Sequence, residues 1–252
     1  MSYQFKPSLL VSSFFLILII GLIGLGAWQL NRADEKQSLQ TLIDQRSSLE
    51  PLSLNMPFEE FAPYQIVRAT GQYKLKDSIL LDNIVYQGKA GYYLITPFEI
   101  LASRAVILVN RGWLPQGKTR EDLPEFKTPK DVITIEGHLN HPRSKPVLLG
   151  NISNPISATP PLWYYMDQNF FSQINGYPIL PLVLKLNAKG QTSTYTSSPI
   201  PSDETEPALI QDWPSYDSKS GMHIGYAIQW FVFALFGLVA YAGLSVKKIK
   251  KD

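Results

Sequence analysis

The residues at the start of the last apolar run have types and a spacing that could hold a flat apolar ligand. On a helix, His223, Tyr226, Ala227, Trp230 and Ala234 share one face, at steps of three, four and seven residues. A small residue bordered by two aromatic rings could admit a macrocycle, and an imidazole can ligate iron. A haem would need little beyond one axial histidine, a dry slot and a cation near its propionates. Two other interpretations stay open: His223 can cap the helix or bind a lipid headgroup, and the face can pack against another helix.

Two arginines are candidates for that cation. Arg111 follows the strongest of the predicted strands, within the sequence VNRGWLP. Gly112 and Pro115 equally indicate an ordinary turn, in which Arg111 would only be solvated. Arg32 lies at the end of the first apolar run, one helical turn from Lys36, and this pair could reach lipid phosphates or simply be solvated. Both arginines are therefore candidates for the site, and for each the alternative is a solvated side chain that binds no ligand.

The remaining residues argue against other kinds of chemistry. The chain has no cysteine, which excludes disulfides, thiolate zinc sites and cysteine nucleophiles. His138 and His141 follow a predicted strand and are expected in an exposed turn, where two histidines make a poor zinc or copper site. The methionines, at positions 1, 56, 166 and 222, are too scattered for a copper chaperone. No G-x-S-x-G, H-E-x-x-H or phosphate-binding glycine motif occurs, so we expect no enzymatic activity and disfavour a membrane-anchored hydrolase.

Two apolar runs at the ends of the chain are long enough to cross a membrane. Residues 223–246 contain no charge and are followed by four lysines, Lys247, Lys248, Lys250 and Lys251, which favour a cytoplasmic C-terminus. Residues 9–30 are also uncharged; a signal peptide is the rival interpretation, but the run is longer than the apolar core of such a peptide. Small residues could let the two spans pack together: Gly21, Gly24, Gly26, Gly237, Ala240 and Gly243. We therefore expect two transmembrane helices, with both termini cytoplasmic and the central region outside the cytoplasm.

Between the spans the pattern changes from helix to strand. Residues 31–50 predict a juxtamembrane helix that continues the first span and stops before Pro51. Residues 51–188 predict an external β-rich domain, with strands at 66–73, 78–86, 91–100, 104–114, 132–139 and 179–186. A short helix is predicted at 167–174, with Asp167 as its N-cap. Residues 189–222 predict a polar linker, and residues 247–252 a basic cytoplasmic tail. The expected fold class is a membrane α+β protein, in which two terminal transmembrane helices flank an antiparallel sheet or small barrel.

Five short motifs follow one another along the chain: LGAWQLNRADEK at the first membrane exit, YYLITPFE, VILVNRGWLP, WYYMDQ, and HIGYAIQWFVFA at the last span. In this order they resemble the surfeit locus protein 1 family of cytochrome c oxidase assembly factors. The resemblance covers both spans and the domain between them. It implies a membrane protein of aerobic respiration, with no assigned catalytic activity, that assists the insertion of haem a into oxidase subunit I or its stabilisation there.

The resemblance also implies roles for particular residues. His223 aligns with a histidine implicated in haem binding in bacterial relatives and would be the axial metal ligand. Tyr226 and Trp230 would then flank the macrocycle, and Arg111 or Arg32 would meet a propionate. This chain departs from the family in having Ala33-Asp34-Glu35 after Arg32 and a long acidic linker before His223. Those departures weaken the transfer of any haem contact outside His223.

Location and partners follow from the same resemblance. It implies a multi-pass protein of the cell inner membrane with a periplasmic central domain, in contact with oxidase subunit I, the haem a synthesis machinery and membrane lipid. A net charge of +2 without a clustered basic face gives no indication of a nucleic-acid partner. The rival interpretation is a membrane-anchored scaffold that binds proteins during respiratory complex assembly and has no haem site. Purification with oxidase subunits but without haem absorbance would favour that rival.

Overall fold

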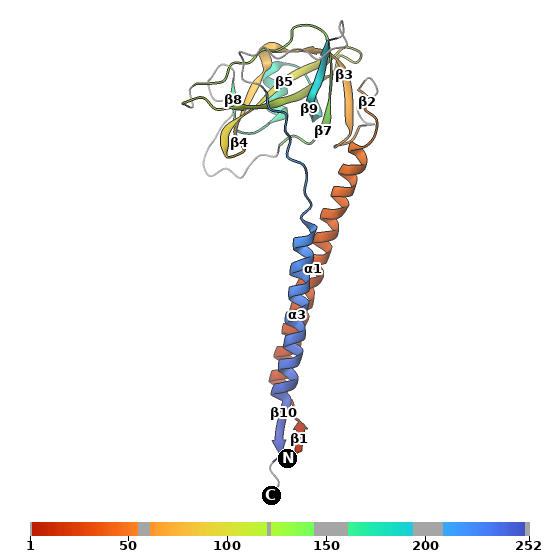
Figure 1. Cartoon of the computed structure of the whole chain (residues 1–252), viewed down its shortest axis with the longest axis vertical. Helices are drawn as coiled ribbons and strands as arrows, with labels where there is room; N and C mark the ends of the chain where they lie inside the picture. The colour runs from red at the N-terminus through yellow and green to blue at the C-terminus, as the bar shows by residue number, and fades with distance from the viewer. Residues whose placement is uncertain (1, 55–60, 120–121, 144–160, 194–208, 250–252) are drawn as a thin grey trace. The chain divides into compact units, whose positions relative to one another are not determined.

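The computed structural model describes residues 2–54, 61–119, 122–143, 161–193 and 209–249. The chain divides into two compact units, one made of residues 1–44 and 215–252 and the other of residues 45–214. The unit that contains both termini is built on two long helices, and the other unit holds the large β-sheet (Figure 1).

The helical unit consists mainly of α1 (Leu9–Ser47) and α3 (Ser220–Ser245). Both helices contain a segment long and apolar enough to cross a membrane, and only 6% and 17% of the residues in those segments are buried. Their apolar side chains therefore face outward, unlike those of a core helix in a soluble protein. Two short strands, β1 (Ser2–Phe5) and β10 (Val246–Ile249), pair antiparallel at the far ends of the helices. This pairing places the two chain termini at the same end of the helix pair (Figure 1).

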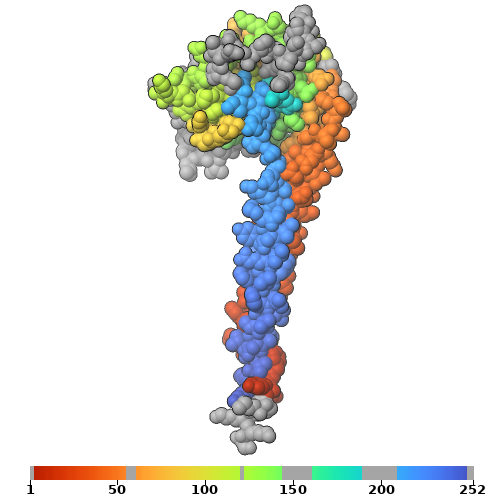
Figure 2. Space-filling model, in the orientation of Figure 1, coloured from red at the N-terminus to blue at the C-terminus, as the bar shows by residue number. Residues whose placement is uncertain are grey.

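The two long helices meet along a seam that repeats every seven residues. On α3 the partly or fully buried positions are spaced alternately by four and three residues: His223, Ala227, Trp230, Ala234, Gly237 and Tyr241. On α1 the same spacing gives Phe15, Ile19, Leu22, Gly26, Gln29, Ala33 and Lys36. Such a repeat is typical of two helices that wind around each other with a left-handed twist. Figure 2 shows the side chains of α3 lying against those of α1.

Only two of the small residues predicted to bring the spans together lie in this seam. A Cβ added at Gly26 would come within 2.5 Å of the Phe231 ring, and one at Gly237 would lie 3.5 Å from Ile19. The other four predicted positions have open space around them or are exposed: Gly21, Gly24, Ala240 and Gly243. The prediction was wrong for these four because the seven-residue repeat turns only every third or fourth position toward the partner.

The β unit is a closed barrel of five strands with additional strands along its edges. Its strands are β2 (Leu52–Ser53), β3 (Ile66–Tyr73), β4 (Ile79–Tyr86), β5 (Lys89–Ile100), β6 (Val106–Pro115), β7 (Ile133–Asn140), β8 (Leu162–Trp163) and β9 (Ile179–Ser193). The order β3-β7-β9-β6-β5 closes on itself because β5 also pairs with β3. The predicted small barrel is therefore present, although β6 and β9 run parallel instead of antiparallel.

All six predicted strands occur within a few residues of their expected positions, and β9 continues to Ser193, into the predicted linker. The short 3-10 helix η2 (Leu75–Asp77) links β3 to β4. Helix α2 (Gln168–Asn175) begins as predicted, because Asp167 Oδ1 accepts a hydrogen bond of 3.0 Å from the Phe170 amide. Linker residues 194–208 and two of the terminal lysines, Lys250 and Lys251, lie outside the described residues.

Side chains along the strands point alternately into the barrel and out of it, and apolar residues form a layer on each face. Val109, Leu184 and their neighbours fill the interior, where they are fully buried. Leu108 and Val183 belong to a second cluster, which lies on the outer face together with residues of β4 and α2. Because successive side chains of a strand point to opposite faces, Lys185 shares the outer face with Val183.

Candidate functional site

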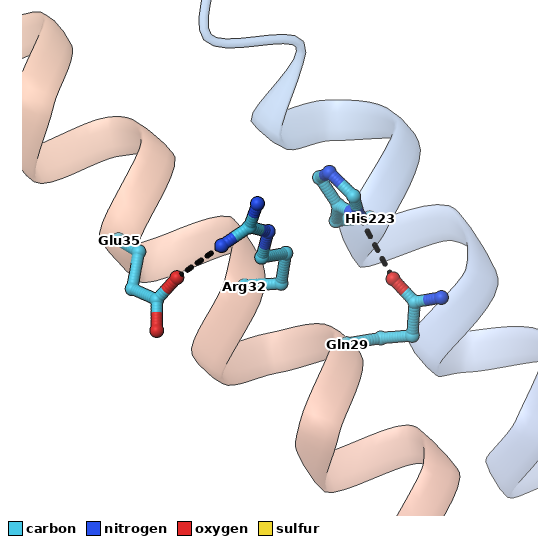
Figure 3. A network of polar contacts seen from close by, with 4 residues as sticks. All are labelled: Gln29, Arg32, Glu35 and His223. Carbon is cyan, nitrogen blue, oxygen red and sulfur yellow. Dashed lines mark hydrogen bonds and ion pairs between the residues drawn. The ribbon is translucent and has the colours of Figure 1, made fainter. Parts of the chain in front are cut away.

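The imidazole of His223 lies in the seam between the long helices. Its Nδ1 is 2.8 Å from Oε1 of Gln29 on α1, as Figure 3 shows. Because an amide oxygen can only accept a hydrogen bond, this contact selects the tautomer of the neutral imidazole in which Nδ1 carries the proton and Nε2 the lone pair. No hydrogen bond to Nε2 is found within the described part of the chain. A histidine oriented in this way through one nitrogen is ready to bind a metal through the other.

Arg32 lies one turn along α1 from Gln29. Its Nη1 forms an ion pair of 2.7 Å with Oε2 of Glu35, and Figure 3 shows the guanidinium turned toward that carboxylate. The two side chains are 47% and 63% exposed, so the ion pair adds little to stability. Arg32 is therefore an accessible cation in the same stretch of the helix pair as His223.

The aromatic residues do not form the predicted slot. Ala227 is fully buried and Ala234 is 5% exposed, so the small residues of the predicted face are closed within the helix seam. Trp230 also lies in the seam and packs edge-on against Phe233, at 6.0 Å between ring centroids. Tyr226 is 53% exposed and lies off the seam. Packing against the other helix, the alternative left open above, is what the structure shows for this face.

Arg111 lies in the β unit, within strand β6. Opposite it, the pairing of β6 with β5 shifts register between Gly112 and Asn110, so Arg111 is the extra residue of a β-bulge. Its side chain is buried, donates to Thr128 Oγ1 at 2.5 Å and to the Lys127 carbonyl at 2.8 Å, and lies 5.1 Å from the centroid of the Tyr73 ring. The interpretation of Arg111 as a solvated turn residue was wrong, because the strand continues to Pro115.

Burial changes the pKa of the tyrosine that lies against that guanidinium. Desolvation raises the pKa of the Tyr73 hydroxyl to about 12, and the charge of Arg111 offsets part of this effect. Both side chains thus belong to the closed interior of the β unit. The structure groups His223, Gln29 and Arg32 in the helical unit and places Arg111 in the other unit.

The two remaining histidines are placed differently from one another. His138 is in strand β7 and half-buried, not in the turn predicted for it, whereas His141 is exposed beyond the strand end. Burial lowers the pKa of His138, and the nearby charge of Lys185 lowers it further. Among the described residues, no group of three or more His, Cys, Asp or Glu side chains could hold a metal ion.

These side chains suit a haem only in part. The open Nε2 of His223 fits a single axial ligand, and Arg32 is accessible to an anion. The closed alanines and the outward Tyr226 do not fit a slot that encloses the macrocycle. Sequence reasoning also missed Gln29 as the partner of His223. The spacing of Gly26, Gln29 and Ala33 by three and then four residues was the signal that could have identified it.

Comparison with known proteins gives consistent matches along the chain. The model of the SURF1 family matches residues 16–235. A SURF1-like protein of Rickettsia prowazekii is 30% identical over 90% of this chain and 87% of its own length. The surfeit locus protein 1 of Takifugu rubripes is 22% identical over 94% of this chain and 98% of its own length. A SURF1-like protein of Monosiga brevicollis is 26% identical over 66% of each chain, just under two thirds of that relative's length.

Proposed function

Because the chain belongs to the SURF1 family, we propose that it is a membrane-embedded assembly factor for cytochrome c oxidase. In this proposal it assists the insertion of haem a into oxidase subunit I, or its stabilisation there, and has no catalytic activity of its own. Haem a is then a cargo, and the residues of this chain bind and orient it.

The observation that carries the proposal is the fixed imidazole of His223. Gln29 holds Nδ1 from the neighbouring helix, so Nε2 faces any ligand with its lone pair and a set ring orientation. Arg32, on the same stretch of α1, offers its guanidinium to a carboxylate such as a propionate, in competition with Glu35. Tyr226 and Trp230 contact the macrocycle from its edge, because Ala227 and Ala234 are closed within the helix seam.

The proposed location is the cell inner membrane, with both helices crossing it. Two observations support this topology. Outward-facing apolar side chains cover both long helices, and β1 pairs with β10, so both termini are on one side. Lys247 and Lys248 follow the end of α3 and favour the cytoplasm for that side, and in this proposal the β unit is periplasmic. Subunit I, the haem a synthesis machinery and membrane lipid are the proposed partners.

A scaffold without a haem site is the second candidate function. The burial of Ala227 and Ala234 favours it, because helix packing alone explains the small residues beside Trp230. A scaffold would hold subunit I through the exposed apolar faces of the helices and would use His223 only to join α1 to α3.

Deleting the gene in its host tests the assembly function. The proposal predicts membranes with less cytochrome c oxidase activity and a lower ratio of haem a to haem b, both restored by the wild-type gene. Unchanged oxidase activity and haem a content would contradict it. Restoration by a His223→Ala variant would leave assembly in place and favour the scaffold.

A further inference from the structure

A cavity of about 430 Å³ opens on the outer face of the barrel, within the β unit. Its volume is in the range of roughly 300–1,000 Å³ that is usual for small-molecule sites. Apolar side chains of β4, β5 and β9 line it, among them Leu81, Ile84, Ile95 and Val183. Its polar lining residues are Asn110, Asn140, His141, Arg143 and Lys185. The cavity is thus lined by both apolar and polar side chains, and in the sheet Asn110 lies opposite Ile95 and Asn140 opposite Val183.

The register of three neighbouring strands brings polar residues together at this cavity. Lys185 on β9 lies directly opposite Asn110 on β6 and His138 on β7. Arg143 comes three residues after the end of β7 and lines the same cavity. The described residues that line the cavity include no acidic side chain, and none of the ion pairs found among described residues involves Lys185 or Arg143. The described lining residues therefore carry positive charge and no carboxylate.

Burial makes the positive charge of Lys185 unfavourable. Desolvation lowers the pKa of the Lys185 ammonium, which lies 5.8 Å from the centroid of the Trp213 ring. The charge of Arg143 acts on Tyr93, another residue of the cavity, and offsets part of the pKa increase that burial gives its hydroxyl. A bound anion would compensate the partly desolvated Lys185, where ionic contacts are stronger than in water, and could also contact the exposed Arg143.

We propose that this cavity binds a small amphiphile with one anionic head group, a carboxylate or a phosphate, and a short apolar body. Lys185 and Arg143 contact the head group, and the amide groups of Asn110 and Asn140 donate hydrogen bonds to it. The apolar lining residues contact the body of the ligand. This site is independent of His223 and does not rest on the proposed role in oxidase assembly.

Calorimetric titration of the full-length protein in lipid nanodiscs tests the proposal, with octanoate, octyl phosphate and octyltrimethylammonium as probes. We expect saturable binding of one or both anions and none of the cation. Tighter binding of octanoate would assign a carboxylate ligand, and tighter binding of octyl phosphate a phosphate headgroup. Lys185→Gln and Arg143→Gln should each weaken anion binding about tenfold or more, since each removes a charge-assisted contact. Lys118→Gln, at an exposed lysine outside the cavity, should have no effect.

Asn140→Asp provides a nearly isosteric second test. It adds a negative charge to the lining of the cavity with little change of shape. It should therefore weaken anion binding even if the other variants disturb folding. Equal binding of the anions by wild type and all three cavity variants would show partition into the lipid and overturn the proposal. Equal binding of octyltrimethylammonium, or no saturable binding of either anion, would also overturn it.

Discussion

The imidazole of His223 on α3 is oriented by Gln29 on α1, at 2.8 Å between Nδ1 and Oε1. The two residues are 194 positions apart in sequence, so the orientation of this histidine depends on the pairing of the helices. Binding of any ligand to His223 should therefore be sensitive to changes in α1 that do not touch the ligand itself.

Gln29→Leu should weaken haem binding while leaving His223 in place. Loss of the hydrogen bond frees the ring to rotate, and such a loss of a supporting contact typically costs about 10- to 100-fold in metal affinity. The measurement is a haem titration followed by difference absorbance. Gln37→Leu is the matched control, because Gln37 also joins the helices, through Ser220 at 3.0 Å. Equal haem affinities of the two variants would show that haem binding does not depend on the orientation that Gln29 gives His223.

Gly26→Leu should destabilise the helix pair, because a Cβ at this position meets the Phe231 ring at 2.5 Å. Overpacking of this kind costs about 1–3 kcal/mol, measured as the free energy of unfolding in mild detergent. Gly24→Leu, with open space around it, should be close to neutral. Combining Gly26→Leu with Phe231→Ala should recover part of the loss, and strictly additive effects would rule out a direct clash.

Arg111→Leu should lower the stability of the β unit without changing haem absorbance per folded molecule. The substitution removes the hydrogen bonds to Thr128 and Lys127, and contacts of a charged donor contribute about 1.5–3 kcal/mol each. Thermal and chemical unfolding would measure the loss. Arg68→Ala is the control, because Arg68 is 57% exposed and its ion pair with Glu136 should contribute less than about 1 kcal/mol. A stable Arg111 variant with reduced haem absorbance would instead support a propionate contact.

His138 should make stability depend on pH just below neutrality. Its pKa is lowered in the folded state, mainly by burial, so between that value and the unfolded value of about 6.5 only the unfolded chain is protonated there. Stability should therefore rise with pH up to about 6.5 and then level off. Unfolding midpoints measured between about pH 5 and 8 should lose this rise in His138→Gln and show a smaller rise in Lys185→Gln, which removes the neighbouring charge. An unchanged profile in His138→Gln would contradict this assignment.

Local patterns in the sequence were enough to predict most elements of the β unit. Runs rich in Ile, Val, Leu and Tyr between turn residues predicted strands such as β3, and Asp167 marked the start of α2. Pairing between distant segments could not be predicted in the same way. The two-residue strand β8 is too short to carry a pattern, and the parallel contact of β6 with β9 depends on the path of the chain between them.

The position of His223 near the start of the last helix was predictable, and its neighbours were less so. Tyr226 and Ala227 follow His223 by three and four residues, and either could share its face until the position of α1 is known. In the structure Ala227 is buried in the seam and Tyr226 is exposed. Arg111 could not be placed because a bulge changes which face of β6 it occupies, and a sequence pattern does not reveal a one-residue shift of register.

The visible absorption spectrum most directly tests whether His223 binds haem. The protein would be purified in mild detergent from cells that make haem a, beside His223→Ala, with unfolding curves to confirm that both are folded. We expect a Soret band in the wild type that is absent from the variant. A band of equal intensity in both, or a colourless wild type that still copurifies with oxidase subunit I, would contradict the proposed haem site and leave His223 as a residue that joins two helices.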